Sequence, residues 1–336
     1  MIQTTLARLL DRHDLTRTEA REAMSEIMSG DATQAQIAGF LVALRAKGET
    51  ADEIAGCAEA MREHVLAVSP QREDLVDTAG TGGDGMRTLN ISTAAALLAA
   101  AAGAAVAKHG NRAASSQTGS ADVLEALGFE LELPPEKIAR SIDELGFGFM
   151  FAQAHHPAMR HAAPVRRELG TRTVFNILGP LTNPAGARAQ VVGVYSAKLV
   201  RPIAEALLQL GSHRAFVVHG AGGIDELSPV GPSLVCEVAD GEVHERTIYP
   251  QELGLEHCSV EELRGGAPAE NADAIRRVFA GERGGKRDAI LLNAAGAFAA
   301  AGHAHDLREA LPAVREALDS GAAAARLDEL VEFSRS

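Results

Sequence analysis

The chain has 336 residues with a formal net charge of -13 at pH 7, and 46% of the residues are hydrophobic. This length suffices for two domains or for one large α/β domain. The acidic balance argues against general nucleic-acid binding, which depends on a basic surface. Because no long uncharged apolar span occurs, we expect no membrane association and a cytoplasmic location.

The first seventy residues predict helices alone. Capping-box patterns begin at Thr33 and at Thr50, and each places a hydroxyl before a helix with Gln or Glu three residues later. Apolar residues recur at helical spacing near Phe40 and Leu44. An all-helical module with such an apolar face and no evident chemistry is typical of a packing or dimerisation unit.

From Leu75 onward, short β-rich runs alternate with helices, which is the pattern of an α/β domain with a largely parallel sheet. A first strand is expected to end at Leu75-Val76, and a strand-like segment is expected to end at Leu133. The other expected elements are strands at 147–151 and 215–218, helices over 94–102, 136–145 and 287–302, and a hairpin turn at 240–241.

The stretch from Asp77 to Gly128 contains three polar turns. They are GTGGDG at 80–85, KHGNR at 108–112, and the segment from Ser115 to Ser120, which opens a helix. The residues NIST also stand just before the helical run that starts at Ala94. Backbone N–H groups at a helix start bind phosphate well, and glycines let the backbone approach it closely. With the charges of Lys108 and Arg112, this stretch predicts a ligand that carries several phosphates.

Two further clusters lie outside this stretch. The adjacent histidines His155 and His156 have no matching cysteine or carboxylate set nearby, so a structural role is favoured over metal ligation. The pair Asp225-Glu226 follows a predicted strand and a glycine-rich turn. An acidic pair is commonly a solvated loop, but carboxylate oxygens are also what Mg²⁺ recruits beside phosphate. With a polyphosphate ligand already predicted, the magnesium interpretation is favoured.

The motifs GTGGD, NIST, KHGNRAASS and GSADVLEALG resemble consecutive motifs of the anthranilate phosphoribosyltransferase family. The resemblance extends through HHPAMRHAAPVRRELGTRTVFNILGPLTNP and GIDELSP, and it is collinear from about Thr33 to about Asn293. It implies an α/β fold of the nucleoside phosphorylase/phosphoribosyltransferase type, with a small N-terminal all-helical domain and a larger α/β domain with a central, mostly parallel sheet. The implied boundaries are 1–72, with a contribution from about 160–185, and 73–336. A homodimer through the helical domain is also implied.

The implied activity is Mg²⁺-dependent transfer of the phosphoribosyl group of phosphoribosyl pyrophosphate to the amine of anthranilate, with release of pyrophosphate, in tryptophan biosynthesis. One alternative is a pyrimidine-type nucleoside phosphorylase, which shares the architecture. Another is a non-catalytic relative that binds nucleotides or nucleic acid. The acidic pair and the NIST motif fit a pyrophosphate and metal site better than either alternative.

The resemblance also implies three sets of site residues. Two Mg²⁺ ions are expected at Ser92, Asp225 and Glu226, and anthranilate at Gly80, Asn111 and Arg166, with Gln153 and Met159 flanking the acceptor. His109 is the candidate acid or base, although simple substrate contact is an equal alternative. The residues expected to bind phosphoribosyl pyrophosphate are Gly80, Gly83, Asp84, Thr88, Asn90, Ile91, Ser92, Thr93, Lys108, His109, Gly110, Asn111, Arg112, Ala113, Ala114, Ser115, Ser116 and Ser120.

Overall fold

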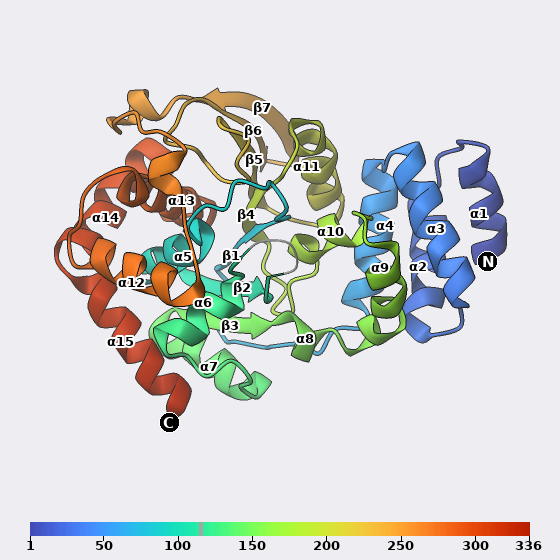
Figure 1. The fold of residues 1–336 in the computed structure, drawn as a ribbon, viewed down its shortest axis with the longest axis horizontal. Coiled ribbons are helices and arrows are strands. Elements are labelled where there is room, and N and C mark those ends of the chain that lie inside the picture. Colours follow the sequence, from blue (N-terminus) through green and yellow to red (C-terminus); the bar gives the residue numbers. More distant parts are fainter. Residues whose placement is uncertain (114–116) are drawn as a thin grey trace.

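The computed structural model describes residues 1–113 and 117–336. A bundle of helices at the N-terminal end lies beside a larger body built around a sheet (Figure 1). The predicted ligand contacts of Ala114, Ser115 and Ser116 lie outside the described residues. No described helix is long and apolar enough to cross a membrane.

The helical bundle contains α1 (Ile2–Leu10), α2 (Arg17–Ser29), α3 (Gln34–Lys47) and α4 (Ala51–Arg62). Three of these helices begin at a threonine whose hydroxyl accepts a backbone N–H while a Glu or Gln side chain returns to the cap. Such reciprocal caps satisfy two backbone donors that a helix start leaves without partners. The predicted capping boxes at Thr33 and Thr50 are therefore confirmed.

Segments from the middle of the chain return to this bundle (Figure 1). They are α9 (Ala163–Leu169), which packs against α3, and α10 (Phe175–Leu178), which packs against α4. The short helix α8 (Ala152–His155) precedes them and lies next to β3. Val165 and Phe175 share one buried core with Phe40 and Leu44 of α3. This packing supports the proposal that residues from about 160 to 185 belong with the helical domain.

The apolar face predicted near Phe40 and Leu44 is not an exposed surface. Both side chains are fully buried, because α9 packs against α3 and the residues of the other bundle helices share their core. The exposed large apolar residues in this region are Met1, Leu10 and Val42.

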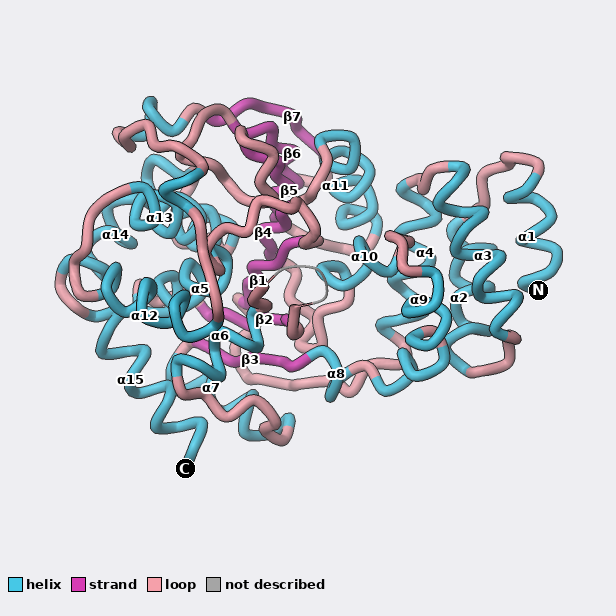
Figure 2. The backbone as a smooth tube through the Cα atoms, in the orientation of Figure 1, coloured by secondary structure: helices cyan, strands magenta, loops and turns pink. Residues whose placement is uncertain are grey.

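The larger body is built on a seven-stranded sheet of order β3-β2-β1-β4-β5-β6-β7. Strands β1 to β5 are parallel, and β6 and β7 add an antiparallel edge (Figure 2). The strands are β1 (Leu75–Gly80), β2 (Ala105–Gly110), β3 (Phe147–Phe151), β4 (Ala189–Gly193), β5 (Arg214–Gly220), β6 (Ser233–Ala239) and β7 (Glu242–Ile248). This confirms the predicted helical domain with a larger α/β domain and a mostly parallel sheet.

Helices cover both faces of the sheet, and strand side chains alternate between two cores. On β4, Val191 joins the core formed with α5 and α13, while its neighbour Val192 joins the core shared with α11 and the helical bundle. The helices of this body are α5 (Ile91–Ala101), α6 (Ser120–Leu127), α7 (Pro135–Leu145), α11 (Val200–Gln209), α12 (Pro268–Phe279), α13 (Gly285–Ala300), α14 (Leu307–Asp319) and α15 (Ala322–Arg335).

Two strand predictions are wrong in position or type. β1 begins at Leu75 and continues to Gly80, so Asp77 lies inside a strand. The segment ending at Leu133 has no strand partner, although Phe129 and Leu131 are buried. The alternation arises because every second side chain of this unpaired segment packs on the core. The same alternation occurs in a paired strand, so the sequence pattern alone does not distinguish the two cases. The hairpin turn at 240–241 is confirmed, with positive φ at both positions.

Candidate functional site

The site lies where the order of the parallel strands reverses. β1 stands between β2 and β4, so the chain leaves β1 toward one side and returns later on the other. Ligands of such sheets bind at the carboxyl ends of the strands at this switch point. Here β1 and β4 end side by side at Gly80 and Gly193.

An acidic loop from the next strand rests on these two glycines. A Cβ atom at Gly193 would lie 1.5 Å from the Asp225 carbonyl oxygen, and one at Gly80 would lie 2.8 Å from Asp225 Oδ2. Asp225 Oδ2 also accepts the backbone N–H of Gly82 at 2.8 Å. The two strand ends therefore need glycine so that the acidic loop can reach the glycine-rich turn.

The glycine-rich turn has a backbone conformation that favours glycine. Gly82, Gly83 and Gly85 all have positive φ, a region that side chains with a Cβ rarely adopt. The guanidinium of Arg172 donates to the Gly83 carbonyl and lies 4.2 Å from the ring centre of Tyr195. The sequence interpretation missed Arg172, which stands inside a quoted motif but carries no distinctive pattern of its own.

The structure brings the predicted metal residues together. Glu226 Oε1 accepts the N–H of Ser92 at 3.1 Å, in the first turn of α5, and the Asp225 N–H donates to Asp84 Oδ2 at 3.4 Å. Burial raises the pKa of both Asp225 and Glu226 above the ordinary value of about 4, and neighbouring carboxylates add to the shift. Three carboxylates gathered around a helix start form a place that favours a cation.

These residues fit Mg²⁺ as part of its coordination shell. Among residues 1–113 and 117–336, no group of three or more His, Cys, Asp or Glu side chains has metal-binding geometry. Mg²⁺ is usually held by one or two carboxylates, with waters and substrate phosphate oxygens completing the octahedron. The pair Asp225 and Glu226 with the hydroxyl of Ser92 matches that mode rather than an all-protein cage.

The start of α5 offers one side chain to a ligand and uses another for structure. Asn90 donates to the carbonyl of Thr118 at 3.0 Å and accepts from Asn271 at 2.9 Å, so both ends of its amide are engaged. Thr93 Oγ1 is buried and has no hydrogen-bond partner among the described residues. A buried hydroxyl without a partner costs free energy, and a ligand oxygen at the helix start would satisfy it.

Lys108 lies inside β2 with 1% of its surface exposed. Its ammonium donates to the carbonyl and hydroxyl of Thr78. Burial lowers the pKa of Lys108, while the charges of Asp77 and Glu226 favour its protonated form. The lysine thus forms the wall behind the acidic pair, whereas the sequence interpretation expected it to project from a turn.

Asp77 and Asn183 are structural members of the site that the sequence interpretation missed. Asn183 donates to Asp77 Oδ2 at 2.8 Å, and the N–H of His109 donates to Asp77 Oδ1 at 3.2 Å. Burial raises the pKa of Asp77 to about 6, and Lys108 opposes this shift. The sequence does show an aspartate in one apolar segment and a lysine in the next, which could have indicated a buried charge interaction. Recognising it would have required the register of β1 and β2.

His109 is a buried, neutral side chain. Its Nδ1 lies 3.1 Å from the Gly179 carbonyl oxygen, and its Nε2 lies 3.2 Å from Nε2 of His156. Burial and the neighbouring imidazole lower the pKa of His109 to about 3. Since a general acid or base works best with a pKa near the working pH, this environment favours the contact role over proton transfer.

The turn after β2 is fixed by its own polar groups. Ser120 Oγ accepts the N–H of Asn111 at 3.1 Å and donates to its carbonyl at 3.2 Å, and Gly110 leaves no space for a Cβ beside it. Arg112, predicted to add charge for phosphate, instead pairs with Asp122 and Glu125. Its guanidinium therefore holds the turn onto α6.

Arg166 belongs to α9, a helix that packs against α3 of the helical bundle (Figure 1). Its guanidinium is 5.1 Å from the ring centre of Phe175 and makes no ion pair or hydrogen bond with a described residue. Burial lowers the pKa of Arg166, and the adjacent Arg167 is exposed as expected. On the sheet side, Gln153 contacts the amide of Asn111 at 3.4 Å. A half-buried guanidinium without a partner is suited to a carboxylate ligand.

Comparisons with known proteins agree with this geometry. Residues 72–324 match the family described as "Glycosyl transferase family, a/b domain", and residues 3–65 match "Glycosyl transferase family, helical bundle domain". The chain is 50% identical over 333 residues to anthranilate phosphoribosyltransferase of Symbiobacterium thermophilum, covering 99% of this chain and 98% of the relative. The enzyme of Anaeromyxobacter sp. (strain K) is 53% identical over 331 residues, covering 98% of each chain.

Solved structures give the same result. Anthranilate phosphoribosyltransferase from Thermus thermophilus has a TM-score of 0.93 and 51% identity, covering 98% of this chain and 99% of that one. The Saccharomyces cerevisiae enzyme in complex with PRPP and Mg has a TM-score of 0.90 and 28% identity, covering 99% and 98%. Its complex with 4-fluoroanthranilate has a TM-score of 0.87 and 27% identity, with the same coverage.

The raised pKa values of Asp225 and Glu226 predict a pH-dependent stability of the metal-free protein. Above about pH 4 the folded state retains protons that the unfolded chain has lost, so the free energy of unfolding should fall as pH rises toward neutrality. Asp225→Asn/Glu226→Gln removes this contribution. Urea unfolding in chelator should therefore show the double variant gaining stability relative to the original chain as pH increases. A difference that stays constant with pH would contradict the burial argument.

Proposed function

The chain belongs to the anthranilate phosphoribosyltransferase family, and on that premise we propose how its residues carry out the reaction. The enzyme transfers the phosphoribosyl group of phosphoribosyl pyrophosphate to the amine of anthranilate, giving N-(5-phosphoribosyl)anthranilate and pyrophosphate in tryptophan biosynthesis. The observation that carries the assignment is a sequence identity of 50% over 99% of the chain. It is joined by the acidic residue Glu226, which lies against the start of α5, where backbone N–H groups favour phosphate. A nucleoside phosphorylase or a non-catalytic relative is not favoured. A cytoplasmic location stays a prediction.

Asp225, Glu226 and Ser92 would hold magnesium against the pyrophosphate, and we propose two ions. Support comes from the gathered carboxylates and from the yeast relative whose structure contains PRPP and Mg. Bound Mg²⁺ would neutralise the pyrophosphate leaving group as its bond to C1 breaks. Asp84 positions this pair by accepting the Asp225 N–H.

The donor is held by backbone amides and by the start of α5. The positive-φ turn around Gly83 presents its backbone to the phosphates, and the helix dipole at Ser92 and Thr93 favours negative charge. The hydroxyl of Thr93, which has no hydrogen-bond partner among the described residues, would gain one from the donor. Lys108 contributes positive charge from the wall behind the pyrophosphate. The remaining predicted donor contacts, Thr88, Ile91, Gly110 and Ala113, stay predictions.

The acceptor enters from the side of the helical bundle. Arg166 binds the carboxylate of anthranilate, and Asn111 and the backbone at Gly80 complete the pocket. The amine then attacks C1 while the C1–O bond to pyrophosphate breaks, and the proton lost from nitrogen passes to the departing pyrophosphate or to water. Because anthranilate's amine is weakly basic and already unprotonated, positioning supplies most of the catalysis, and alignment of this kind is worth roughly 7–11 kcal/mol in favourable cases. His109 acts as a neutral contact.

The metal role is tested by following the loss of anthranilate fluorescence with phosphoribosyl pyrophosphate present. We expect turnover with Mg²⁺, none in excess chelator, and none in Asp225→Asn/Glu226→Gln. Asp240→Asn is the matched control, because it changes an exposed carboxylate in the β6–β7 turn and should retain full activity. Undiminished turnover in excess chelator would show that the reaction does not require Mg²⁺ and would contradict the proposed metal role.

Arg166→Ala should impair use of anthranilate and leave the binding of phosphoribosyl pyrophosphate nearly unchanged. Loss of a charge-assisted contact of about 1.5–3 kcal/mol predicts a drop in kcat/KM for anthranilate of roughly 10- to 150-fold. Arg166→Lys should recover part of the loss, since an ammonium cannot form the two parallel hydrogen bonds of a guanidinium. Arg167→Ala, one residue away and exposed, serves as the control. Kinetic constants for anthranilate in Arg166→Ala that match those of Arg167→Ala would place the carboxylate elsewhere.

We also propose a homodimer through the helical bundle. Leu10 of α1 and Val42 of α3 are exposed, at 69% and 46%, and these two helices pack on each other at the outer side of the bundle (Figure 1). Covering such side chains in a partner subunit would remove apolar surface from water.

Light scattering at micromolar concentration should give the mass of a dimer. Leu10→Glu/Val42→Glu should shift the protein toward monomer, because charges would then be buried without partners. Leu66→Glu alters another exposed leucine, outside α1 and α3, and should leave the dimer intact. A monomeric original chain would contradict this arrangement.

A further inference from the structure

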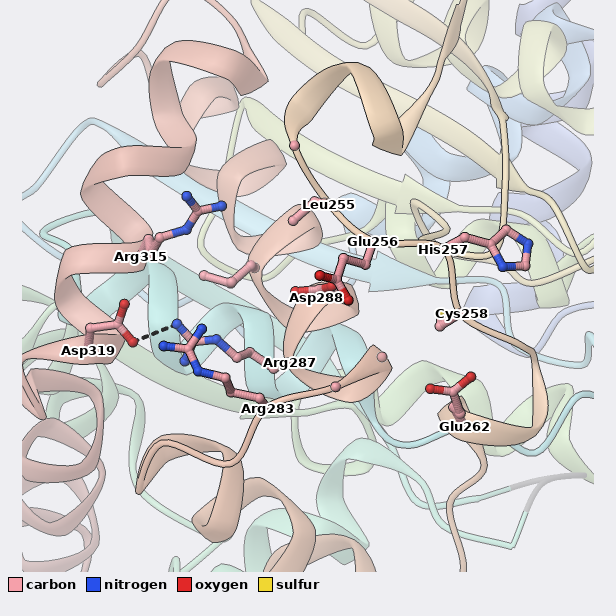
Figure 3. Close-up of a pocket in the computed structure, with 14 residues that line it drawn as sticks. Leu255, Glu256, His257, Cys258, Glu262, Arg283, Arg287, Asp288, Arg315 and Asp319 are labelled. Atoms are coloured by element: carbon pink, nitrogen blue, oxygen red, sulfur yellow. Dashed lines mark hydrogen bonds and ion pairs between the residues drawn. The ribbon is translucent and has the colours of Figure 1, made fainter.

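A cavity with a volume of about 430 Å³ lies apart from the switch point. Its walls are the segment after β7 around residues 254–262, the start of α13, and the end of α14 (Figure 3). None of its lining residues belongs to the donor, acceptor or metal sets. Its volume falls within the range of small-molecule pockets.

One side of this cavity is rich in guanidinium groups. Arg287 is 4% exposed, and its Nη2 binds Asp319 at 2.6 Å, yet its buried Nη1 has no hydrogen-bond partner among the described residues. Arg283 and Arg315 also line the cavity and make no ion pair with a described residue. A buried guanidinium nitrogen without an acceptor costs free energy that a ligand oxygen would recover.

The facing side carries carboxylates. Glu256 and Asp288 lie together near Leu255, toward the middle of the cavity (Figure 3). Burial raises the pKa of Asp288, the Glu256 carboxylate adds to this, and Arg287 and Arg315 oppose it. The complete lining holds three arginines and four carboxylates, together with His257 and Cys258. Asp319 pairs with Arg287 on the arginine side, whereas Glu256 and Asp288 lie apart from the three guanidinium groups (Figure 3).

We propose that this cavity binds a small zwitterion of the α-amino-acid class. The ligand's carboxylate accepts from Arg287 Nη1 and from Arg283 or Arg315, and its ammonium group faces Glu256 and Asp288. A simple anion such as phosphate would satisfy the arginines but would meet uncompensated carboxylates. A ligand with both charges matches both sides.

Both walls of the cavity continue directly into the donor site. Further along α13 from Arg287, Asn293 accepts the N–H of Leu227 at 2.9 Å and donates to the Leu227 carbonyl at 2.8 Å. Leu227 directly follows Asp225 and Glu226, the two residues proposed to hold magnesium. The other wall leads to Leu263, whose carbonyl accepts the N–H of Leu89 at 2.8 Å, just before the start of α5. A ligand that fixes these walls therefore couples to donor binding, and the coupling is reciprocal.

Titration calorimetry with each common L-amino acid alone, and with inorganic phosphate and acetate, tests the site. We expect one or more L-amino acids to bind one per chain, and neither anion to match them. Arg315→Gln and Arg283→Gln change exposed side chains, and at least one of the two should weaken binding about tenfold or more. Asp288→Asn should weaken it as well. Arg308→Gln, on α14 but outside the cavity, should leave it unchanged.

Absence of binding by every L-amino acid would overturn the proposal. Phosphate or acetate binding as tightly as the amino acid, or amino-acid binding that survives Arg315→Gln and Arg283→Gln, would also overturn it. With the amino acid saturating, the affinity for phosphoribosyl pyrophosphate with Mg²⁺ should change about fivefold or more. An unchanged affinity would refute the coupling through α13 and Leu263.

Discussion

The site depends on one steric constraint, the seating of the Asp225 backbone against the ends of two neighbouring strands. At Gly193 there is no space for even one carbon atom between the strand and the Asp225 carbonyl. At Gly80 the Asp225 carboxylate occupies the place of a side chain. This contact fixes the acidic loop against the glycine-rich turn. In the proposed mechanism it thereby sets where the metal and the pyrophosphate lie. The proposed donor binding, leaving-group stabilisation and acceptor alignment all depend on where this loop lies.

Electrostatics follow from this packing. Bringing Asp225 and Glu226 beside Asp84 would be unfavourable without compensating positive charge. The start of α5 supplies partial positive charge through the Ser92 N–H. Lys108 lies inside the sheet, where burial lowers its pKa and the charges of Asp77 and Glu226 favour its protonated form. In the proposed mechanism, metal and pyrophosphate would complete this arrangement. The raised pKa values of Asp225 and Glu226 reflect their burial and the neighbouring negative charges.

The sequence predicted the features that depend on local patterns. The capping boxes, the helix after NIST, the hairpin turn at 240–241 and the acidic pair all follow from residues close together in the chain. Contacts that need strand register were not predictable in this way. Nothing in the sequence distinguishes Gly193 from the other glycines, of which the chain has 33 in all; its role appears only once β4 is placed beside β1. Likewise, Lys108 and Asp77 are brought near each other only by the pairing of their strands.

The burial of side chains was the second property that could not be predicted from the sequence. Phe40 and Leu44 have the spacing of an exposed dimer face, but a segment more than a hundred residues away covers them. His109 has the chemistry of an acid or base, yet its pKa is set by a neighbouring imidazole and by burial. Such environments come from long-range packing, which a single sequence does not display.

Gly193→Ala tests the central steric claim most directly. The added methyl group must displace the Asp225 backbone, and a shift of about 1 Å in a catalytic group can cost roughly a hundredfold in rate. We therefore expect kcat/KM for phosphoribosyl pyrophosphate to fall about a hundredfold, with a cooperative melting transition showing that the variant still folds. A folded Gly193→Ala enzyme with kinetic constants near those of the original chain would contradict the account.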